Sequence, residues 1–191
     1  MIHVVLRTCN RTSLQSDRIV NKSECVLRCL NSIITNLKDI EEKTLHIIDD
    51  NSSEDFREKL KKLTEPYSYI TINFLPWMDK SELSPKKKTR YSVEVAYDYI
   101  YNLPEDDLVY IVEDDYLHKP QAIKDIVAVI DYLKTLQPIE YAVHPFNCPH
   151  RYSSFDSLYP SYIIAGPNQY WRSSFHSTHT FFVRNQTFRA N

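Results

Sequence analysis

The sequence contains a single glycine, Gly166, among its 191 residues. Phosphate-binding loops of the P-loop and dinucleotide types need several glycines, for positive φ angles and for close approach of the backbone to phosphate. The sequence therefore excludes both kinds of loop. Any nucleotide bound by this chain has to be held by side chains and a metal ion.

Charge and hydropathy exclude further classes of protein. Lys and Arg number 23 against 25 Asp and Glu, and the isoelectric point is about 6.4, which argues against a nucleic-acid partner. The mean hydropathy is −0.44, and no apolar run approaches the ~18 residues of a transmembrane segment. The apolar N-terminus reaches a charged residue, Arg7, before the hydrophobic region of a signal peptide can form. No Cys-x-x-Cys spacing is present, which excludes a zinc ribbon and a thioredoxin motif. These features predict a cytoplasmic protein of one domain.

Strand-like and helix-like segments alternate along the first two thirds of the chain. This order predicts an α/β fold with a mostly parallel central sheet flanked by helices. Beyond residue 137 the chain is aromatic, has only two acidic residues and resembles the lining of a ligand cleft. We expect strands at 2–6, 45–48, 69–75, 108–112, 141–143, 162–165 and 178–183, helices at 20–37, 53–63, 91–103 and 120–136, and a loop at 77–88.

Polar residues follow three of the expected strands directly. They are Arg7-Thr8, Asp49-Asp50 and the triplet Glu113-Asp114-Asp115. Because the carboxyl ends of parallel strands form one ligand-binding edge, five carboxylates are expected to converge there. Oxygen ligands in that number suit Mg²⁺ or Mn²⁺, which also bind diphosphates. The alternative is that these acids only cap helices or turn the chain.

Several of these motifs resemble family 2 glycosyltransferases of the GT-A fold. The run from Ile47 to Ser52 is similar to the end of their second strand, and residues 113–115 resemble their DXD motif. Lys88-Thr89-Arg90-Tyr91 resembles a basic helix start that precedes the DXD strand, and 178–183 resembles the acceptor-side strand. The resemblance covers residues 2 to about 190. It implies one GT-A (Rossmann-like) domain over 1–191, with a nucleotide-sugar-binding half (1–115) and an acceptor-side half (116–191).

The resemblance also implies a function. The implied enzyme is a metal-dependent glycosyltransferase of the hexosyltransferase class. It would transfer a sugar from a nucleotide-sugar donor to a carbohydrate or other hydroxyl acceptor, in glycan or polysaccharide synthesis. Asp50, or Asp49 beside it, would accept the N3 hydrogen of uracil or thymine, which favours a UDP- or dTDP-sugar. Arg7 and Thr8 would contact the base and the ribose, and Asp114 would lie near the ribose or the metal. Arg90 is the preferred cation for the diphosphate, ahead of Lys86, Lys87 and Lys88. Arg11 is a further nucleotide-binding candidate.

The implied cofactor is Mn²⁺ or Mg²⁺, bound by Asp115. His176 or His179 would complete the metal's ligands, although each histidine could instead be an ordinary hydrogen-bonded residue. Trp171 and Tyr170 are expected to stack on a sugar or acceptor ring, with structural packing as the alternative.

The general base is the part of the pattern that this sequence lacks. Inverting family members carry a carboxylate on a helix after the acceptor strand, but here residues 184–191 are polar and show no cap or closing element. Asp156 could supply the base, the base could lie in further domains of a longer protein of which this chain is a fragment, or the enzyme could retain configuration. We favour inversion. A non-catalytic nucleotide- or sugar-binding module on the same fold is the alternative function.

Overall fold

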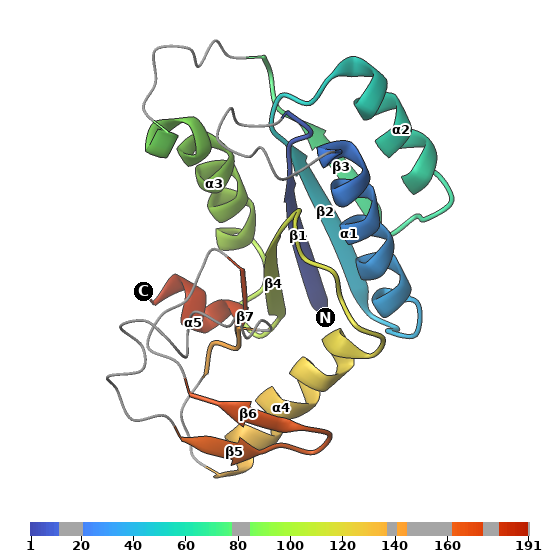
Figure 1. The fold of residues 1–191 in the computed structure, drawn as a ribbon. Helices are drawn as coiled ribbons and strands as arrows, with labels where there is room; N and C mark the ends of the chain where they lie inside the picture. The colour runs from blue at the N-terminus through green and yellow to red at the C-terminus, as the bar shows by residue number, and fades with distance from the viewer. Residues whose placement is uncertain (12–20, 78–84, 137–140, 145–161, 174–179, 191) are drawn as a thin grey trace.

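The computed structural model describes residues 1–11, 21–77, 85–136, 141–144, 162–173 and 180–190, and only the backbone for 85–89. Strands and helices alternate as expected (Figure 1). The elements in chain order are β1 (Ile2–Thr8), α1 (Lys22–Leu37), β2 (Lys43–Asp49), α2 (Glu54–Thr64), β3 (Ile70–Phe74), α3 (Pro85–Tyr101), β4 (Leu108–Glu113), α4 (Ala122–Leu136), β5 (Ile163–Ala165), β6 (Tyr170–Arg172), β7 (Phe181–Arg184) and α5 (Asn185–Arg189).

The central sheet has five strands in the order β3-β2-β1-β4-β7. β3, β2, β1 and β4 run parallel, and β7 is antiparallel to β4. Of the strand expected at 141–143, the structure shows only a bridge from Val143 to Phe182. β5 and β6 form a separate two-stranded hairpin. The predicted α/β class with a mostly parallel sheet is confirmed.

Helices cover both faces of the sheet. α1, α2 and α4 pack on one face, where Leu30, Phe56 and Ile126 join alternate strand residues such as Leu6 and Tyr110 in the larger core. α3 packs on the other face, in a smaller core whose buried members are Val5, Ile48, Leu75, Ala96, Ile100, Val109 and Ile111. Burial of β1 and β4 on both faces explains why these strands read as continuous apolar runs.

Several element boundaries differ from the predictions, and the strand β6 and the helix α5 were not predicted. α3 begins at Pro85, so residues 85–88 are helical and not part of a loop; proline suits the first position of a helix. α4 begins at Ala122, after Gln121 takes a positive φ of 69°. The prediction of a chain end without a closing element was wrong. Asn185 begins the short helix α5, and its side-chain amide donates to the carbonyl of Leu103 at 2.7 Å.

The single glycine is explained by packing. Gly166 lies in the turn of the β5–β6 hairpin, where its amide donates to the carbonyl of Gln169. Its φ is not positive, but an added Cβ would lie 2.7 Å from the indole of Trp171. A side chain at position 166 would therefore have to displace the tryptophan ring.

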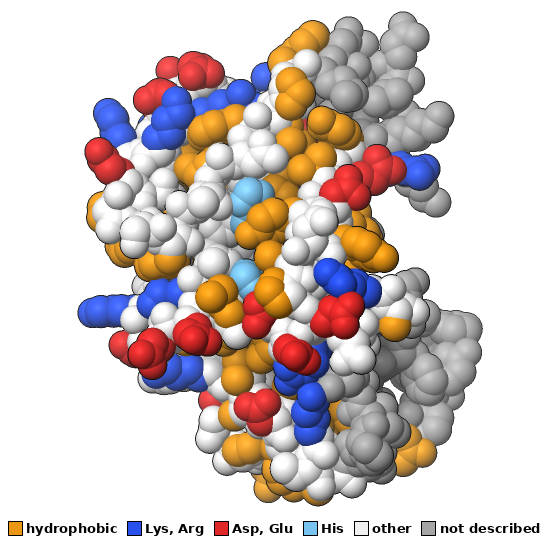
Figure 2. Space-filling view, turned by 180° about the vertical axis from the view of Figure 1, so that it is seen from behind, with side chains coloured by type: hydrophobic (Ala, Val, Ile, Leu, Met, Phe, Trp, Pro, Cys, Tyr) orange, Lys and Arg blue, Asp and Glu red, His pale blue; other side chains and the backbone are white. Residues whose placement is uncertain are grey.

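Seen from behind, acidic and basic side chains are interspersed over the described surface, and histidine side chains lie near the middle (Figure 2). No helix in the described part of the chain is long and apolar enough to span a membrane.

Candidate functional site

The three polar strand ends meet at one edge of the sheet. The strand register pairs Thr8 with Asp49 on one side of β1, and Arg7 with Glu113 on the other. The hydroxyl of Thr8 donates to Oδ2 of Asp49 at 3.2 Å, and the amide of Cys9 donates to Oδ2 of Asp114 at 2.8 Å. The three strand ends therefore lie together at one edge, as expected, whereas a single site made by their five carboxylates stays a prediction. We call these strand ends, with the residues that directly follow them, the carboxylate edge.

Asp49 is the buried member of the first acidic pair. Its side chain is fully buried and accepts hydrogen bonds from Nε of Arg57 at 2.9 Å and from the amide of Ser52 at 3.2 Å, besides that of Thr8. The same arginine donates to the carbonyl of Leu75 at 3.0 Å, just beyond β3. Asp49 therefore joins the ends of three strands and is enclosed by protein donors.

Asp50 differs from Asp49 in being partly exposed. Its amide donates to the carbonyl of Thr8 at 2.8 Å, and one carboxylate oxygen accepts from the side-chain amide of Asn51 at 2.8 Å. Asn51 has a φ of 62°, a conformation that asparagine tolerates better than most residues. Asp49 and Asp50 thus lie in different surroundings, one buried and the other partly exposed.

The second acidic pair repeats this division. Asp114 is buried, and its Oδ1 lies 2.5 Å from Nζ of Lys22, the first residue of α1. Burial raises the pKa of Asp114, against the opposing effect of Lys22. The pKa of Lys22 is also raised, because the attraction and hydrogen bond of the Asp114 carboxylate outweigh the lowering effect of burial. Asp115, the next residue, is exposed.

Glu113 lies on the opposite face of the sheet from Asp114, since successive strand residues alternate. Its Oε1 is 3.7 Å from Nη1 of Arg7, whose side chain is only 11% exposed. Its backbone amide donates a hydrogen bond to the hydroxyl of Thr180, the residue before β7, at 3.2 Å. The structure thus places Arg7 beside Glu113, and the predicted contact of Arg7 with base and ribose stays a prediction.

The other candidates fall into three groups. Arg90 is exposed on α3 and pairs with Glu94 at 2.6 Å, and Arg11 is exposed two residues after Cys9. Asp156, His176 and His179 lie outside the described residues. Trp171 and Tyr170 lie in the β5–β6 hairpin, which packs along α4 at the other end of the sheet from the carboxylate edge (Figure 1). The structure does not bring these two aromatic residues together with the carboxylates.

A metal ion would find a limited set of protein ligands at this edge. Among the described residues no group of three His, Cys, Asp or Glu side chains could hold a metal. The exposed carboxylate of Asp115 nevertheless fits a magnesium-type site, because such ions are often bound by one or two carboxylates together with substrate phosphates. Metal binding at this edge stays a prediction, with Asp115 as the candidate ligand.

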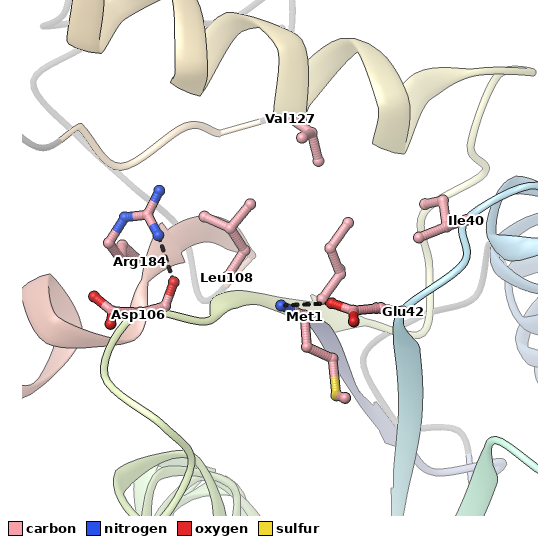
Figure 3. A pocket seen from close by; sticks show the side chains of 8 residues that line it. Met1, Ile40, Glu42, Asp106, Leu108, Val127 and Arg184 are labelled. Carbon is pink, nitrogen blue, oxygen red and sulfur yellow. Dashed lines mark hydrogen bonds and ion pairs between the residues drawn. The ribbon is translucent and has the colours of Figure 1, made fainter.

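A pocket at the opposite end of the strands is unrelated to these residues. Figure 3 shows it between the starts of β1 and β4 and helix α4, lined by Met1, Leu108, Val127 and Arg184 among others. The N-terminal ammonium of Met1 lies 3.7 Å from Oε2 of Glu42 there. In an open α/β sheet, ligands bind at the carboxyl ends of strands, so the carboxylate edge remains the candidate site.

Sequence reasoning missed three residues of this edge. Arg57 and Lys22 supply the cations for Asp49 and Asp114. Asn10 connects the ends of β1 and β2: its amide donates to the hydroxyl of Ser52 at 2.9 Å, and its side-chain oxygen accepts from the amide of Ser53. Arg57 lies one helical turn beyond Ser53, a spacing that could have indicated a contact with the preceding strand end.

The sheet order and the helices on both faces define an α/β domain, and comparison with solved structures shows that its fold is GT-A-like. Neither a protein-family profile nor a curated protein sequence matches the chain. Among solved structures, the galactosyltransferase LgtC, in complex with donor and acceptor sugar analogues, aligns with 99% of this chain at a TM-score of 0.52 and 11% identity. At that identity the likeness shows the fold.

Two further structures align over part of the chain. S. aureus TarS (residues 1–349) aligns with 75% of this chain at a TM-score of 0.47 and 17% identity. A putative nucleotide-diphospho-sugar transferase from Desulfovibrio desulfuricans G20 aligns with 74% of this chain at a TM-score of 0.42 and 13% identity. The chain spans about a third of the TarS structure, 60% of LgtC and 56% of the Desulfovibrio protein.

Proposed function

We propose that this chain is a glycosyltransferase domain that transfers a sugar from a UDP- or dTDP-sugar to an acceptor hydroxyl, with Mn²⁺ or Mg²⁺. One observation carries the proposal. Each acidic strand end pairs a buried carboxylate that has its own cation, Asp49 or Asp114, with a more exposed carboxylate, Asp50 or Asp115. Helix caps or chain turns alone do not require a second, accessible carboxylate at both places.

The residues suit the parts of a nucleotide-sugar. Asp50 accepts the N3 hydrogen of uracil or thymine; adenine and cytosine have no hydrogen at the equivalent ring nitrogen. Asp114 accepts from a ribose hydroxyl, since each of its oxygens retains a second lone pair. Asp115 holds the metal ion, which supplies charge neutralisation for the leaving diphosphate when it is bound. Arg90 and Arg11 are the exposed cations that could approach the phosphates.

The likeness to LgtC supports this proposal, because that protein is a galactosyltransferase whose structure holds donor and acceptor sugar analogues. A carbohydrate is accordingly the proposed acceptor here. Asp156 stays the candidate base for an inverting reaction, and His176 and His179 stay candidate metal ligands.

Release of UDP from UDP-sugars tests the proposal against a non-catalytic binding module. The purified chain, incubated with UDP-glucose, UDP-galactose or UDP-N-acetylglucosamine and Mn²⁺, should release UDP faster than a blank does. The Asp115→Asn variant should lose this activity, whereas Asp39→Asn, which changes an exposed aspartate at the far end of α1, should keep it. Nucleotide binding without any hydrolysis or transfer would favour the binding module.

A further inference from the structure

Lys22 and Asp114 form a partly enclosed ion pair between α1 and the end of β4. Their side chains are 16% and 12% exposed, and Nζ lies 2.5 Å from Oδ1. The other carboxylate oxygen accepts the amide hydrogen of Cys9 at 2.8 Å. Both oxygens of Asp114 are therefore held by the protein, so the orientation of the carboxylate is fixed before any ligand arrives.

The position of Lys22 is unfavourable for a cation on local grounds. It is the first residue of a 16-residue helix, after the N-cap Asn21, and the amino end of a helix carries a partial positive charge. Acidic residues are favoured at this place, and Glu24 in the same turn follows that preference. The attraction of Asp114 offsets the unfavourable effect of the helix dipole on Lys22.

The neighbouring Asp115 is exposed, whereas Asp114 is buried. A buried carboxylate without a partner is costly, because its charge loses the solvation of water. Lys22 supplies that partner from within the chain. Asp114 therefore needs no divalent cation to be neutralised, and the two acids can have separate tasks.

We propose that Lys22 is a positioning residue for nucleotide binding: it is the resident counter-ion of Asp114, holds that carboxylate ready for the ribose hydroxyls, and leaves the divalent cation to Asp115. This inference rests on the proposed function of the carboxylate edge. It predicts that loss of Lys22 weakens nucleotide binding without weakening the binding of the metal alone.

Calorimetric titration of the full chain with UDP in the presence of Mn²⁺ tests the proposal. Lys22→Met should raise the Kd for UDP at least tenfold, and Lys22→Arg should stay within about threefold of wild type. The matched control is Lys61→Met. Lys61 makes an ion pair of the same length, 2.5 Å, with Glu58 on the exposed face of α2. It should leave the Kd unchanged. A folded Lys22→Met variant with the wild-type Kd overturns the proposal.

Two further measurements separate positioning from general stability. The Kd for Mn²⁺ alone, followed by electron paramagnetic resonance without nucleotide, should be unchanged or lower in Lys22→Met; an increase overturns the proposal. In the Asp114→Asn background, Lys22→Met should add no further loss of UDP binding, because Lys22 acts through Asp114. An additional loss there overturns the proposal, and this comparison holds even if the single variant fails to fold.

The wild-type titration distinguishes the two levels of failure. If the wild-type chain binds neither UDP nor dTDP, the proposed function falls and the inference with it. If the wild type binds UDP and the Lys22 variants behave as it does, only the inference on Lys22 falls.

Discussion

Nε of Arg57 lies 2.9 Å from Oδ1 of Asp49, a carboxylate with no exposed surface. Through this pair and its bond to the carbonyl of Leu75, one guanidinium from α2 joins the ends of β2 and β3. The bond from Thr8 to Asp49 adds the end of β1. These contacts of Asp49 and Arg57 explain how the ends of β1, β2 and β3 are held in fixed positions beside Asp50.

Replacing Arg57 should therefore destabilise the fold. Arg57→Met leaves the charge of Asp49 buried without its cation, and breaking such a buried pair costs about 3–5 kcal/mol. Urea denaturation measures the change in unfolding free energy. Arg28→Met is the matched control, because Arg28 pairs with Glu24 on the exposed face of α1, where ion pairs contribute about 0.5 kcal/mol. Equal effects of the two substitutions would show that the pair at Asp49 is not structural.

Asp50 is expected to act on the ligand more than on the fold. Asp50→Ala should weaken UDP binding by about 10- to 100-fold, since a hydrogen bond to a charged group contributes about 1.5–3 kcal/mol. Calorimetry measures the Kd, and the melting temperature reports the fold. Wild-type affinity in this variant would remove Asp50 from the base-binding site.

Stability should fall in mild acid because of His118, which lies in the loop between β4 and α4. Its Nε2 lies 2.7 Å from the hydroxyl of Tyr110, and its Nδ1 lies 3.1 Å from the hydroxyl of Ser32. Burial lowers the pKa of His118 from 6.5 to about 4. The unfolded chain therefore takes up a proton at higher pH than the folded chain, and stability is lost as the pH falls from 6.5 towards 4.

Between pH 7.5 and pH 5 this linkage amounts to at most about 2 kcal/mol. Urea denaturation at both pH values, for wild type and His118→Gln, measures it. The variant should lose less stability than wild type over this range, because its side chain does not titrate. Parallel losses in the two proteins would show that His118 does not account for the effect.

Gly166 provides a prediction outside the carboxylate edge. Gly166→Ala brings a Cβ within 2.7 Å of the indole of Trp171, so the ring has to shift and the β5–β6 hairpin should be destabilised. Overpacking of this kind typically costs about 1–3 kcal/mol. Near-ultraviolet circular dichroism and tryptophan fluorescence follow the ring. An unchanged spectrum and an unchanged melting temperature would contradict the packing explanation.

The sequence predicts the sheet well because its signals are local. β1 and β4 can be located from their continuous apolar residues, and α1 from the helical spacing of its apolar residues. Asp49 and Asp114 come at the ends of expected parallel strands, and this position is sufficient to place them at one edge of the sheet. The partners of these acids are not local. Lys22 is 92 residues from Asp114, and no pattern in the sequence connects them.

The distinction between neighbouring acids also needs three-dimensional structure. Asp49 and Asp50 are adjacent and chemically identical, and the structure shows that Asp49 is buried against Arg57 whereas Asp50 is partly exposed. The short helix α5 escaped prediction because five residues give too little periodicity, and its contacts with Leu103 come from a distant part of the chain.

The central claim is that the carboxylate edge binds a pyrimidine nucleoside diphosphate with a divalent metal. Thermal denaturation of the wild-type chain with UDP, dTDP, GDP or ADP, each with and without Mn²⁺, tests it most directly. A ligand at 100 times its Kd stabilises a fold by about 2.7 kcal/mol, which raises the melting temperature by several degrees. We predict a Mn²⁺-dependent rise with UDP or dTDP that is absent in Asp115→Asn. No rise with any nucleotide, or equal rises with all four, would contradict the claim.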